Sequence, residues 1–212
     1  MNPDRVRSII IGSYLGDGTI AKPQTKNSQC YLKIQHSIKQ ADYIYWKQQL
    51  LPNFFSKPLI VNRKFKGEDY TSIATTTKVH PFCTKLRSLY VDGKKTLKDS
   101  IFKDFDELGL AIWYMDDGNL SWRRKTRKDG SSYKYIGGIK IATCSFTEQE
   151  CNILIDLLKR KWNLNSKIYW TKGKYPTLWL NSENAKLFIE IVKPFVPDCM
   201  EYKINIQRET PK

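Results

Sequence analysis

The chain has 212 residues, of which 41% are hydrophobic and 13% aromatic, so it can bury a sizeable core and is not a disordered segment. Its 36 Lys and Arg residues against 21 Asp and Glu give a formal charge of +15, which favours a polyanionic partner. Divided after Asp106, the sequence has 18 basic and 9 acidic residues in its first part and 18 and 12 in its second, which excludes an acidic domain with a basic tail.

Cysteine usage and the length of the apolar runs limit the cellular compartments in which the protein is expected. The five cysteines (30, 83, 144, 151 and 199) include no CxxC pair, and an odd number cannot close into a complete set of disulfides. We therefore expect buried thiols, a reducing compartment and no zinc ribbon. The N-terminal apolar run is too short to span a bilayer, so no transmembrane segment or signal peptide is predicted. A soluble protein of an organelle matrix or stroma, or of a prokaryotic cytoplasm, fits these limits.

Two apolar segments a hundred residues apart end in the same way. Residues 9–18 read IIIGSYLGDG and residues 110–118 read LAIWYMDDG. Each is too long for a hairpin arm and ends in Gly, which predicts a helix, then Asp17 or Asp117, then a left-handed Gly cap. One Asp-Gly alone would more often be a hairpin turn, but two copies in matching contexts favour helix ends.

Negative charge on carboxylates at these two positions is electrostatically unfavourable. The C-terminus of a helix already carries partial negative charge, so Asp17 and Asp117 are unfavourable there unless a cation compensates them. Oxygen-only ligation by carboxylates and carbonyls suits Mg²⁺ better than zinc or copper. The repeated ending therefore indicates one metal-binding site shared by two halves of the chain.

Matching elements follow the two segments. Alternating apolar and polar residues predict strands at 31–36 and 139–143, and helices follow at 40–51 and 147–162, the second opening on a capping box at Thr147. Strand pairs are predicted at 59–65 with 70–75 and at 167–171 with 177–180. Lys85-Leu86 and Lys186-Leu187 are expected to begin matching helices. The α+β order αββαββα thus occurs twice, with a first repeat at 1–93, a linker at 94–106 and a second repeat at 107–212.

The two motifs make the chain resemble the LAGLIDADG homing endonucleases that carry both motifs on one chain, as in yeast mitochondrial introns. The likeness is most specific at residues 110–118 and continues at 12–17, 94–96, 143–147, 193–195 and 200–203. It implies motif helices that pack at a pseudo-two-fold axis and two antiparallel sheets that form a saddle over DNA. The sequence departs from the family pattern at Asp116, where the name motif has Ala, and at the bulky Ile112, Trp113 and Tyr114. Gly12, Gly16 and Ala111 are the small residues expected at the helix contact.

The resemblance also implies site residues. Asp17 and Asp117 would bind catalytic Mg²⁺, for which Mn²⁺ could substitute, with Gly16 and Asp116 adding backbone carbonyls. Lys95 and Lys203, which close the two repeats, would be the basic residues of the two active sites. The alternative is that they are two solvated lysines among many. Gln35 falls where the family often has a polar side chain that supports water or metal.

Other polar residues divide between structure and DNA contact. His36 and His80 have no partner at metal-ligand spacing and are expected to be structural or surface histidines. Period two places Lys33 and Gln35 opposite Leu32 and Ile34, on a face that can lie in the major groove. Residues 123–128 form the densest basic cluster, which predicts a hairpin along DNA or, alternatively, a solvated loop. The expected DNA contacts are Lys22, Lys26, Lys33, Gln35, Arg63, Lys64, Lys66, Arg123, Arg124, Lys125, Arg127, Lys128, Lys134, Lys140, Lys167, Tyr169, Lys172 and Lys174.

These features favour a monomeric, Mg²⁺-dependent endonuclease that makes a staggered double-strand break in a long, asymmetric DNA target. An intron RNA maturase on the same fold, with or without DNA cleavage, is the main alternative. A DNA-binding regulator on this scaffold is less favoured because it would be expected to lose one or both of Asp17 and Asp117, which are present.

Overall fold

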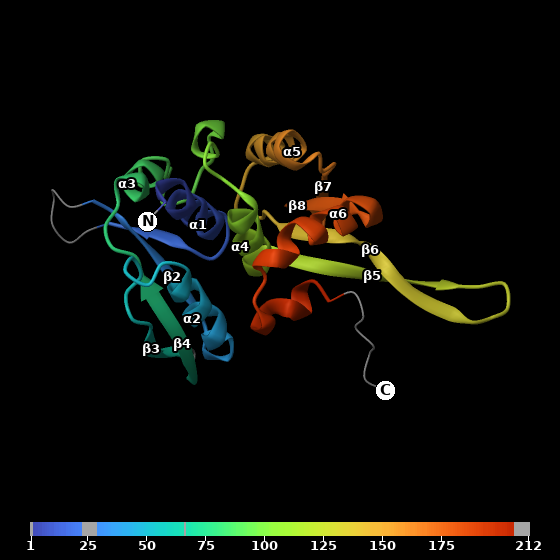
Figure 1. Cartoon of the computed structure of the whole chain (residues 1–212), viewed down its shortest axis with the longest axis horizontal. Helices are drawn as coiled ribbons and strands as arrows, with labels where there is room; N and C mark the ends of the chain where they lie inside the picture. The colour runs from blue at the N-terminus through green and yellow to red at the C-terminus, as the bar shows by residue number, and fades with distance from the viewer. Residues whose placement is uncertain (1, 23–28, 66, 206–212) are drawn as a thin grey trace.

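The αββαββα order occurs twice, as predicted, in a computed structural model that describes residues 2–22, 29–65 and 67–205 (Figure 1). The elements of the first half are α1 (Pro3–Leu15), β1 (Thr19–Ala21), β2 (Tyr31–Ser37), α2 (Ala41–Leu50), β3 (Leu59–Phe65), β4 (Glu68–Thr76) and α3 (Pro81–Arg87). Those of the second half are α4 (Glu107–Asp117), β5 (Gly118–Thr126), β6 (Ser132–Ala142), α5 (Glu148–Trp162), β7 (Lys167–Thr171), β8 (Tyr175–Asn181) and α6 (Ser182–Val192). The two halves therefore build equivalent units.

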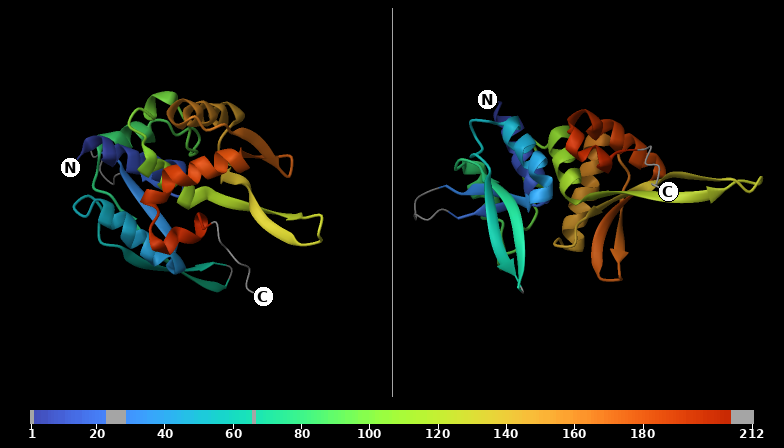
Figure 2. Two further views of the ribbon diagram at one scale, coloured as in Figure 1. Left: turned by 45° about the vertical axis from the view of Figure 1, so that its right-hand side comes forward. Right: turned by 90° about the horizontal axis from the view of Figure 1, so that it is seen from below.

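Each half forms one antiparallel sheet of four strands. The strand orders are β1-β2-β4-β3 and β5-β6-β8-β7, which are the same order in corresponding strands. The sheets lie on opposite sides of the paired helices α1 and α4, and the β3–β4 and β7–β8 hairpins project the same way (Figure 2, right). The two sheets thus form the predicted saddle, with the motif helices at its centre.

Helices α1 and α4 approach closely because glycine lies at their contact. A Cβ at Gly12 would lie 2.3 Å from the carbonyl oxygen of Gly109, so neither helix could keep this spacing with a larger residue at position 12. Ala111, the small residue expected on the second motif helix, is fully buried, and Gly109 is the residue that Gly12 faces. Ser8 and Asp106 add polar contacts between the two halves: the Ser8 hydroxyl donates to the Asp106 carboxylate, and the Asp106 N–H donates to Ser8 Oγ at 3.0 Å.

The left-handed Gly caps predicted after the motif helices are wrong. Helix α1 already ends at Leu15, and Gly18, its predicted cap, is not among the glycines with positive φ. Gly118 has φ −83° and ψ 151°, so α4 passes directly into β5. Both glycines serve close packing instead of an unusual backbone conformation. A Cβ at Gly118 would lie 1.9 Å from Cδ2 of Tyr114, and one at Gly18 would lie 2.6 Å from the carbonyl oxygen of Ser13. A residue with a side chain would displace its neighbours at either position.

Two helices also begin earlier than predicted. Helix α3 begins at Pro81 behind the cap residue His80, whose Nδ1 accepts from the Phe82 N–H at 3.2 Å, so Lys85-Leu86 lies in its second half. Helix α6 begins at Ser182 because Asn181 caps it, which places Lys186-Leu187 in mid-helix. The capping box at Thr147 is confirmed.

Cysteines 30, 83 and 151 are buried as expected, whereas 144 and 199 are exposed. Within the described residues, no helix combines the length and apolar character needed to cross a bilayer.

Candidate active site at the helix interface

The motif carboxylates meet where α1 and α4 end. Asp17 follows α1, with a side chain that is 46% exposed, while Asp116 and Asp117 are the last two residues of α4. Burial, together with the neighbouring carboxylates of Asp17 and Asp116, raises the pKa of Asp117 to about 7. The fold therefore brings the two predicted metal ligands close enough for their charges to interact, which is the arrangement that a cation would stabilise.

Two lysines border this cluster. Lys95 Nζ donates to the carbonyl oxygen of Gly16 at 2.8 Å, and Lys203 Nζ donates to that of Gly118 at 2.7 Å. Burial lowers the pKa of both lysines, and the attraction of the aspartates opposes that shift. Residues that close the two halves of the sequence are thus held beside the carboxylates, one against each motif.

A pair of tyrosines in the motifs holds the segments that carry these lysines. The Tyr14 hydroxyl donates to the carbonyl of Thr96 at 2.9 Å, and the Tyr114 hydroxyl donates to the carbonyl of Lys203 at 2.7 Å. Both tyrosines are fully buried, and burial raises the pKa of each. Sequence analysis missed this role, although a Tyr three residues before the Asp in both motifs was a visible signal.

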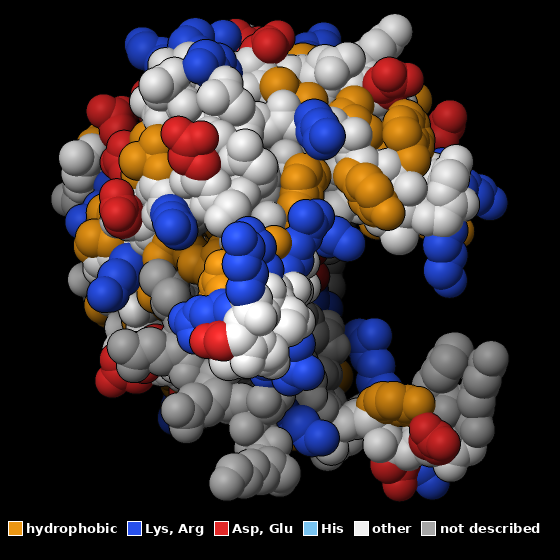
Figure 3. All heavy atoms as spheres, turned by 90° about the vertical axis from the view of Figure 1, so that its right-hand side faces the viewer, with side chains coloured by type: hydrophobic (Ala, Val, Ile, Leu, Met, Phe, Trp, Pro, Cys, Tyr) orange, Lys and Arg blue, Asp and Glu red, His pale blue; other side chains and the backbone are white. Residues whose placement is uncertain are grey.

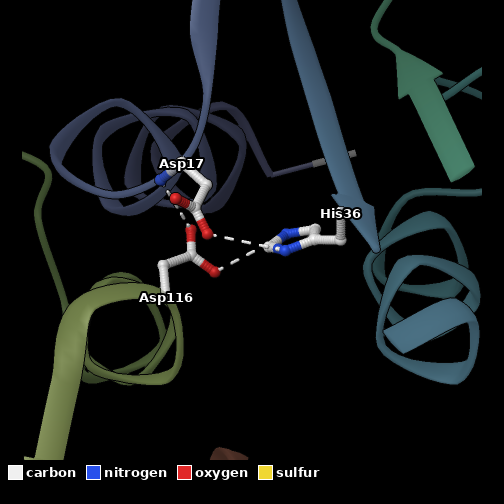
Figure 4. A group of neighbouring side chains, drawn as sticks. All are labelled: Asp17, His36 and Asp116. Carbon is white, nitrogen blue, oxygen red and sulfur yellow. Dashed lines mark hydrogen bonds and ion pairs between the residues drawn. The ribbon is translucent and has the colours of Figure 1, made fainter. Parts of the chain in front are cut away.

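His36 belongs to the site, contrary to the expectation of an ordinary structural or surface histidine. Its Nδ1 lies 3.5 Å from Asp17 Oδ2, and its Nε2 lies 3.9 Å from Asp116 Oδ1 (Figure 4). Burial lowers the pKa of His36, and the nearby Lys47 ammonium lowers it further. The alternation that places Leu32 and Ile34 in the core places His36 on the same face, so period two alone could have found it.

Gln35 faces the other way from His36. Its Nε2 donates to Ser72 Oγ on β4 at 2.7 Å. The structure thus places the Gln35 side chain on the sheet face, next to a neighbouring strand, and brings the following residue to the carboxylates instead.

Asp17, His36 and Asp116 could themselves be considered a metal cluster, because one ligand atom of each lies within 4.8 Å of the others. However, the Asp116 side chain is fully buried and already binds Lys47 Nζ at 2.8 Å and the Tyr43 hydroxyl at 2.8 Å. A second cation would have to compete with that ammonium. Asp17 and Asp117 therefore fit an oxygen-ligated metal better than this trio does.

The saddle surface of the first sheet carries three of the predicted DNA contacts on one face. The strand register puts Lys33, Gln35 and Arg63 on the same side, because Gln35 pairs with Ala74 and Arg63 pairs with Tyr70, an even number of residues earlier in β4. Lys64 pairs with Asp69 and points to the opposite face. The sequence prediction grouped Arg63 with Lys64, and the alternation of the strand separates them.

The second sheet has a hollow of about 280 Å³ on the corresponding face. It is lined by Ser121, Arg123, Lys140, Lys167, Tyr169 and Trp179. Lys140 Nζ lies 5.1 Å from the ring centre of Tyr169 and 5.9 Å from that of Trp179, so two aromatic rings hold this cation in place. Four predicted contacts meet here, together with Trp179, which the sequence analysis did not select.

The basic cluster lies on a long hairpin formed by β5 and β6. Arg124, Lys125, Arg127 and Lys128 are exposed on it, and the chain reverses at the predicted turn, where Gly130 has φ +83°. Lys and Arg side chains gather around this projecting part of the surface, beside a notch in the molecule (Figure 3). Lys134 lies on β6, Lys172 and Lys174 at the exposed β7–β8 turn, and Lys22 directly after β1. Lys26 and Lys66 lie outside the described residues.

Comparison with known proteins gives the family. Residues 7–188 match the model of the LAGLIDADG DNA endonuclease family, so the chain belongs to that family. Among solved structures, it is similar to the homing endonuclease I-WcaI bound to its DNA recognition sequence, with a TM-score of 0.79, 26% identity, and coverage of 97% of this chain and 88% of that one. The double-motif fold expected from the resemblance is confirmed.

Curated relatives have three kinds of name. The chain is 30% identical over 199 residues to "Probable intron-encoded endonuclease 1" of Wickerhamomyces canadensis, covering 92% of this chain and 81% of the relative. It is 26% identical over 205 residues to "Cytochrome b mRNA maturase bI2" of Debaryomyces hansenii, covering 93% and 72%. It is also 30% identical over 207 residues to "Protein RecA" of Mycolicibacterium chitae, covering 95% of this chain but 46% of the relative, so it spans about half the length of the RecA proteins that it matches.

Proposed function

We propose that the chain is a site-specific homing endonuclease that makes a staggered double-strand break in a long, asymmetric DNA target. The observation that carries the proposal is the pair Asp17 and Asp117, set at the ends of packed motif helices with Lys95 and Lys203 beside them. These groups lie at the centre of a saddle whose two faces bear cationic and amide side chains. A duplex lying along the saddle would present its two backbones to the two half-sites.

The residues present fit a divalent metal. Asp17 and Asp117 would hold Mg²⁺ or Mn²⁺, and their oxygen ligands match the preference of these hard cations. Burial and the neighbouring Asp17 and Asp116 raise the pKa of Asp117 to about 7, so its charged form is unfavourable unless a cation compensates it. When bound, the metal would make water nucleophilic, offset charge on the phosphate and stabilise the leaving 3′ oxygen.

The chain's own groups supply the remaining requirements. Lys95 Nζ and Lys203 Nζ, already anchored by one hydrogen bond each, would direct their other N–H donors and positive charge at the phosphate of one strand each. Because the two motif ends and the two sheets differ in sequence, one monomer would recognise an asymmetric site. The division into repeats at 1–93 and 107–212 with a linker at 94–106 belongs to this proposal, as does a reducing compartment, which suits the five free cysteines.

The similarity to proteins named RecA does not add a second activity to the proposal. No GxxxxGK[ST] phosphate-binding motif occurs anywhere in the 212 residues, whereas both Asp-Gly motifs do. The similarity therefore supports the endonuclease family and not ATP-dependent chemistry.

Cleavage tests the proposal directly. Purified protein would be incubated with Mg²⁺ and a library of the DNA that flanks its gene, and cut ends would be captured and sequenced. The parent protein should cut one long site with a fixed stagger. Asp17→Asn and Asp117→Asn should each abolish cleavage while retaining DNA affinity. Absence of a cut site for the parent would contradict the enzyme, and full activity of either Asn variant would contradict the assigned ligands.

A maturase role is the second candidate, favoured by the likeness to the bI2 maturase. Binding to RNA transcribed from the flanking DNA, and a faster rate of its splicing, would support that role. Loss of cleavage in Asp117→Asn with unchanged splicing would separate the two activities.

A further inference from the structure

A buried ion pair joins the two halves of the molecule next to Asp17. Lys47 on α2 places Nζ 2.8 Å from Oδ1 and 3.1 Å from Oδ2 of Asp116 on α4, and both side chains are 0% exposed. The Tyr43 hydroxyl donates to the same Oδ1 at 2.8 Å. A charge buried this deeply needs its partner, because removing one residue of the ion pair leaves the other charge unpaired in a nonpolar interior.

The Asp116 carboxylate also contacts the backbone of the other motif. The Asp17 N–H donates to Asp116 Oδ2 at 3.2 Å. Gly16 makes this possible because a Cβ there would lie 2.5 Å from Asp116 Cβ and from Oδ2. The turn that carries Asp17 is therefore held by a side chain from the opposite repeat.

Among the residues that the structure describes, this arrangement exists on one side of the pseudo-two-fold axis only. Asp116 precedes Asp117 as Gly16 precedes Asp17, and Gly16 has no side chain to reach across. Helix α5, the counterpart of α2, buries Cys151, Leu154, Leu157 and Leu158 where α2 buries Lys47, and its one buried charged residue, Glu150, is engaged in the Thr147 capping box. The extra carboxylate and its lysine are thus a matched pair, absent together from the other half.

We propose that Lys47 and Asp116 form a cross-repeat positioning pair that fixes the backbone of Asp17. Lys47 holds the Asp116 carboxylate in place, and that carboxylate accepts from the Asp17 N–H, so the first half-site is positioned by the second repeat. The consequence for cleavage rests on the proposed function. The ion pair and the hydrogen bond do not, because both join groups of the chain itself.

A double-mutant cycle tests the pair. In urea unfolding with EDTA, Lys47→Met and Asp116→Asn should each lower the folding equilibrium constant by about 100-fold or more, because each leaves a buried group unmatched. The double variant should recover most of that loss. The exposed pair Arg160–Asp99, joined at 2.6 Å, is the matched control, and R160M should have little effect. Single variants no less stable than R160M, or additive losses in the double variant, would overturn the pair.

Two charge-balanced double variants test the positioning role. K47M/D116N keeps an oxygen acceptor for the Asp17 N–H, whereas K47M/D116A removes it. Amide hydrogen exchange of Asp17, measured by NMR in the protein without DNA or metal, should be about tenfold faster in the Ala variant than in the Asn variant. Equal exchange rates in the two would overturn the role of Asp116, whatever the protein cleaves.

The same two variants connect the position of Asp17 to catalysis. On the DNA target, K47M/D116A should cut about 100-fold more slowly than K47M/D116N at equal DNA affinity, since small misplacements of a catalytic group carry costs of that size. Equal cleavage rates, with the difference in exchange intact, would remove the catalytic consequence and leave the structural pair. A parent protein that cleaves no DNA would refute the proposed function while the unfolding and exchange results still decide the pair.

Discussion

The ends of the two motifs occupy equivalent places in the fold, but their side chains differ in charge and burial. After α1, Gly16 has no side chain and Asp17 is 46% exposed, whereas at the end of α4 two consecutive carboxylates are largely withdrawn from solvent and Asp117 has a pKa of about 7. The first repeat supplies Lys47 to balance Asp116, and nothing equivalent is required in return. Pseudo-symmetry therefore fixes where the two aspartates lie, while the side chains that reach between the halves hold the turn of Asp17.

The largest expected effect comes from the lysines that border the two motif ends. Lys95→Met and Lys203→Met should each slow cleavage of one strand by about 100-fold or more, because each removes the cation beside one half-site. Nicked plasmid should accumulate, with nicks on opposite strands in the two variants when mapped by primer extension. Lys94→Met, at an exposed neighbouring position, is the control and should cleave normally. Equal slowing of both strands by either lysine variant would show that the half-sites are not served separately.

The next effect concerns the buried carboxylate of the second motif. Because the folded-state pKa of Asp117 is raised from 3.8 to about 7, the folded protein binds more protons than the unfolded chain between those pH values. Stability in EDTA should therefore fall as pH rises through this window, by about 4 kcal/mol in total. Asp117→Asn should remove most of that dependence and be the more stable protein at pH 8. The exposed control Asp69→Asn should keep the parent's pH profile, and a flat profile for the parent in urea unfolding would contradict the raised pKa.

A smaller effect is expected at the long β5–β6 hairpin, which differs from the three-residue β1 of the first half. Arg124→Ala combined with Arg127→Ala should weaken DNA binding and lower the slope of log affinity against log salt by roughly 2, since each phosphate contact contributes about 0.9. Lys85→Ala with Lys186→Ala, on exposed positions of α3 and α6, provides a control with the same loss of charge. An unchanged slope in the arginine variant would show that these arginines contact no DNA phosphate and that the hairpin is a solvated loop.

The smallest effect should come from the motif tyrosines. Tyr14→Phe and Tyr114→Phe each delete one buried hydroxyl and its hydrogen bond to the lysine-bearing segment, which should lower the free energy of unfolding by about 1 kcal/mol. Similar losses would show that the two halves are equivalent here, in contrast to their carboxylates. Tyr133→Phe, at an exposed position, should be nearly neutral. A loss of stability in only one of the two motif variants would show that the asymmetry also includes the tyrosine contacts.

Local patterns in the sequence determined the repeated αββαββα order and the matched positions of Asp17 and Asp117, and they predicted every strand except β1 and β5. Such features depend on neighbours in the chain: apolar periodicity, a capping box at Thr147 and matched motif endings all lie within short windows. Alternation also placed Lys33 and Gln35 on the saddle face, as the register bears out. The same rule, applied to His36, would have brought it to the helix interface.

Tertiary structure alone decided what surrounds the aspartates. Lys47 contacts Asp116 across 69 positions, and Gly12 meets Gly109 across the helix pair, so no short window contains either contact. The glycines at 18 and 118 predicted left-handed helix caps, yet the fold uses them for the space that a missing side chain leaves. Charge and volume at a site are sums over all elements packed there, and only the packed chain brings these elements together.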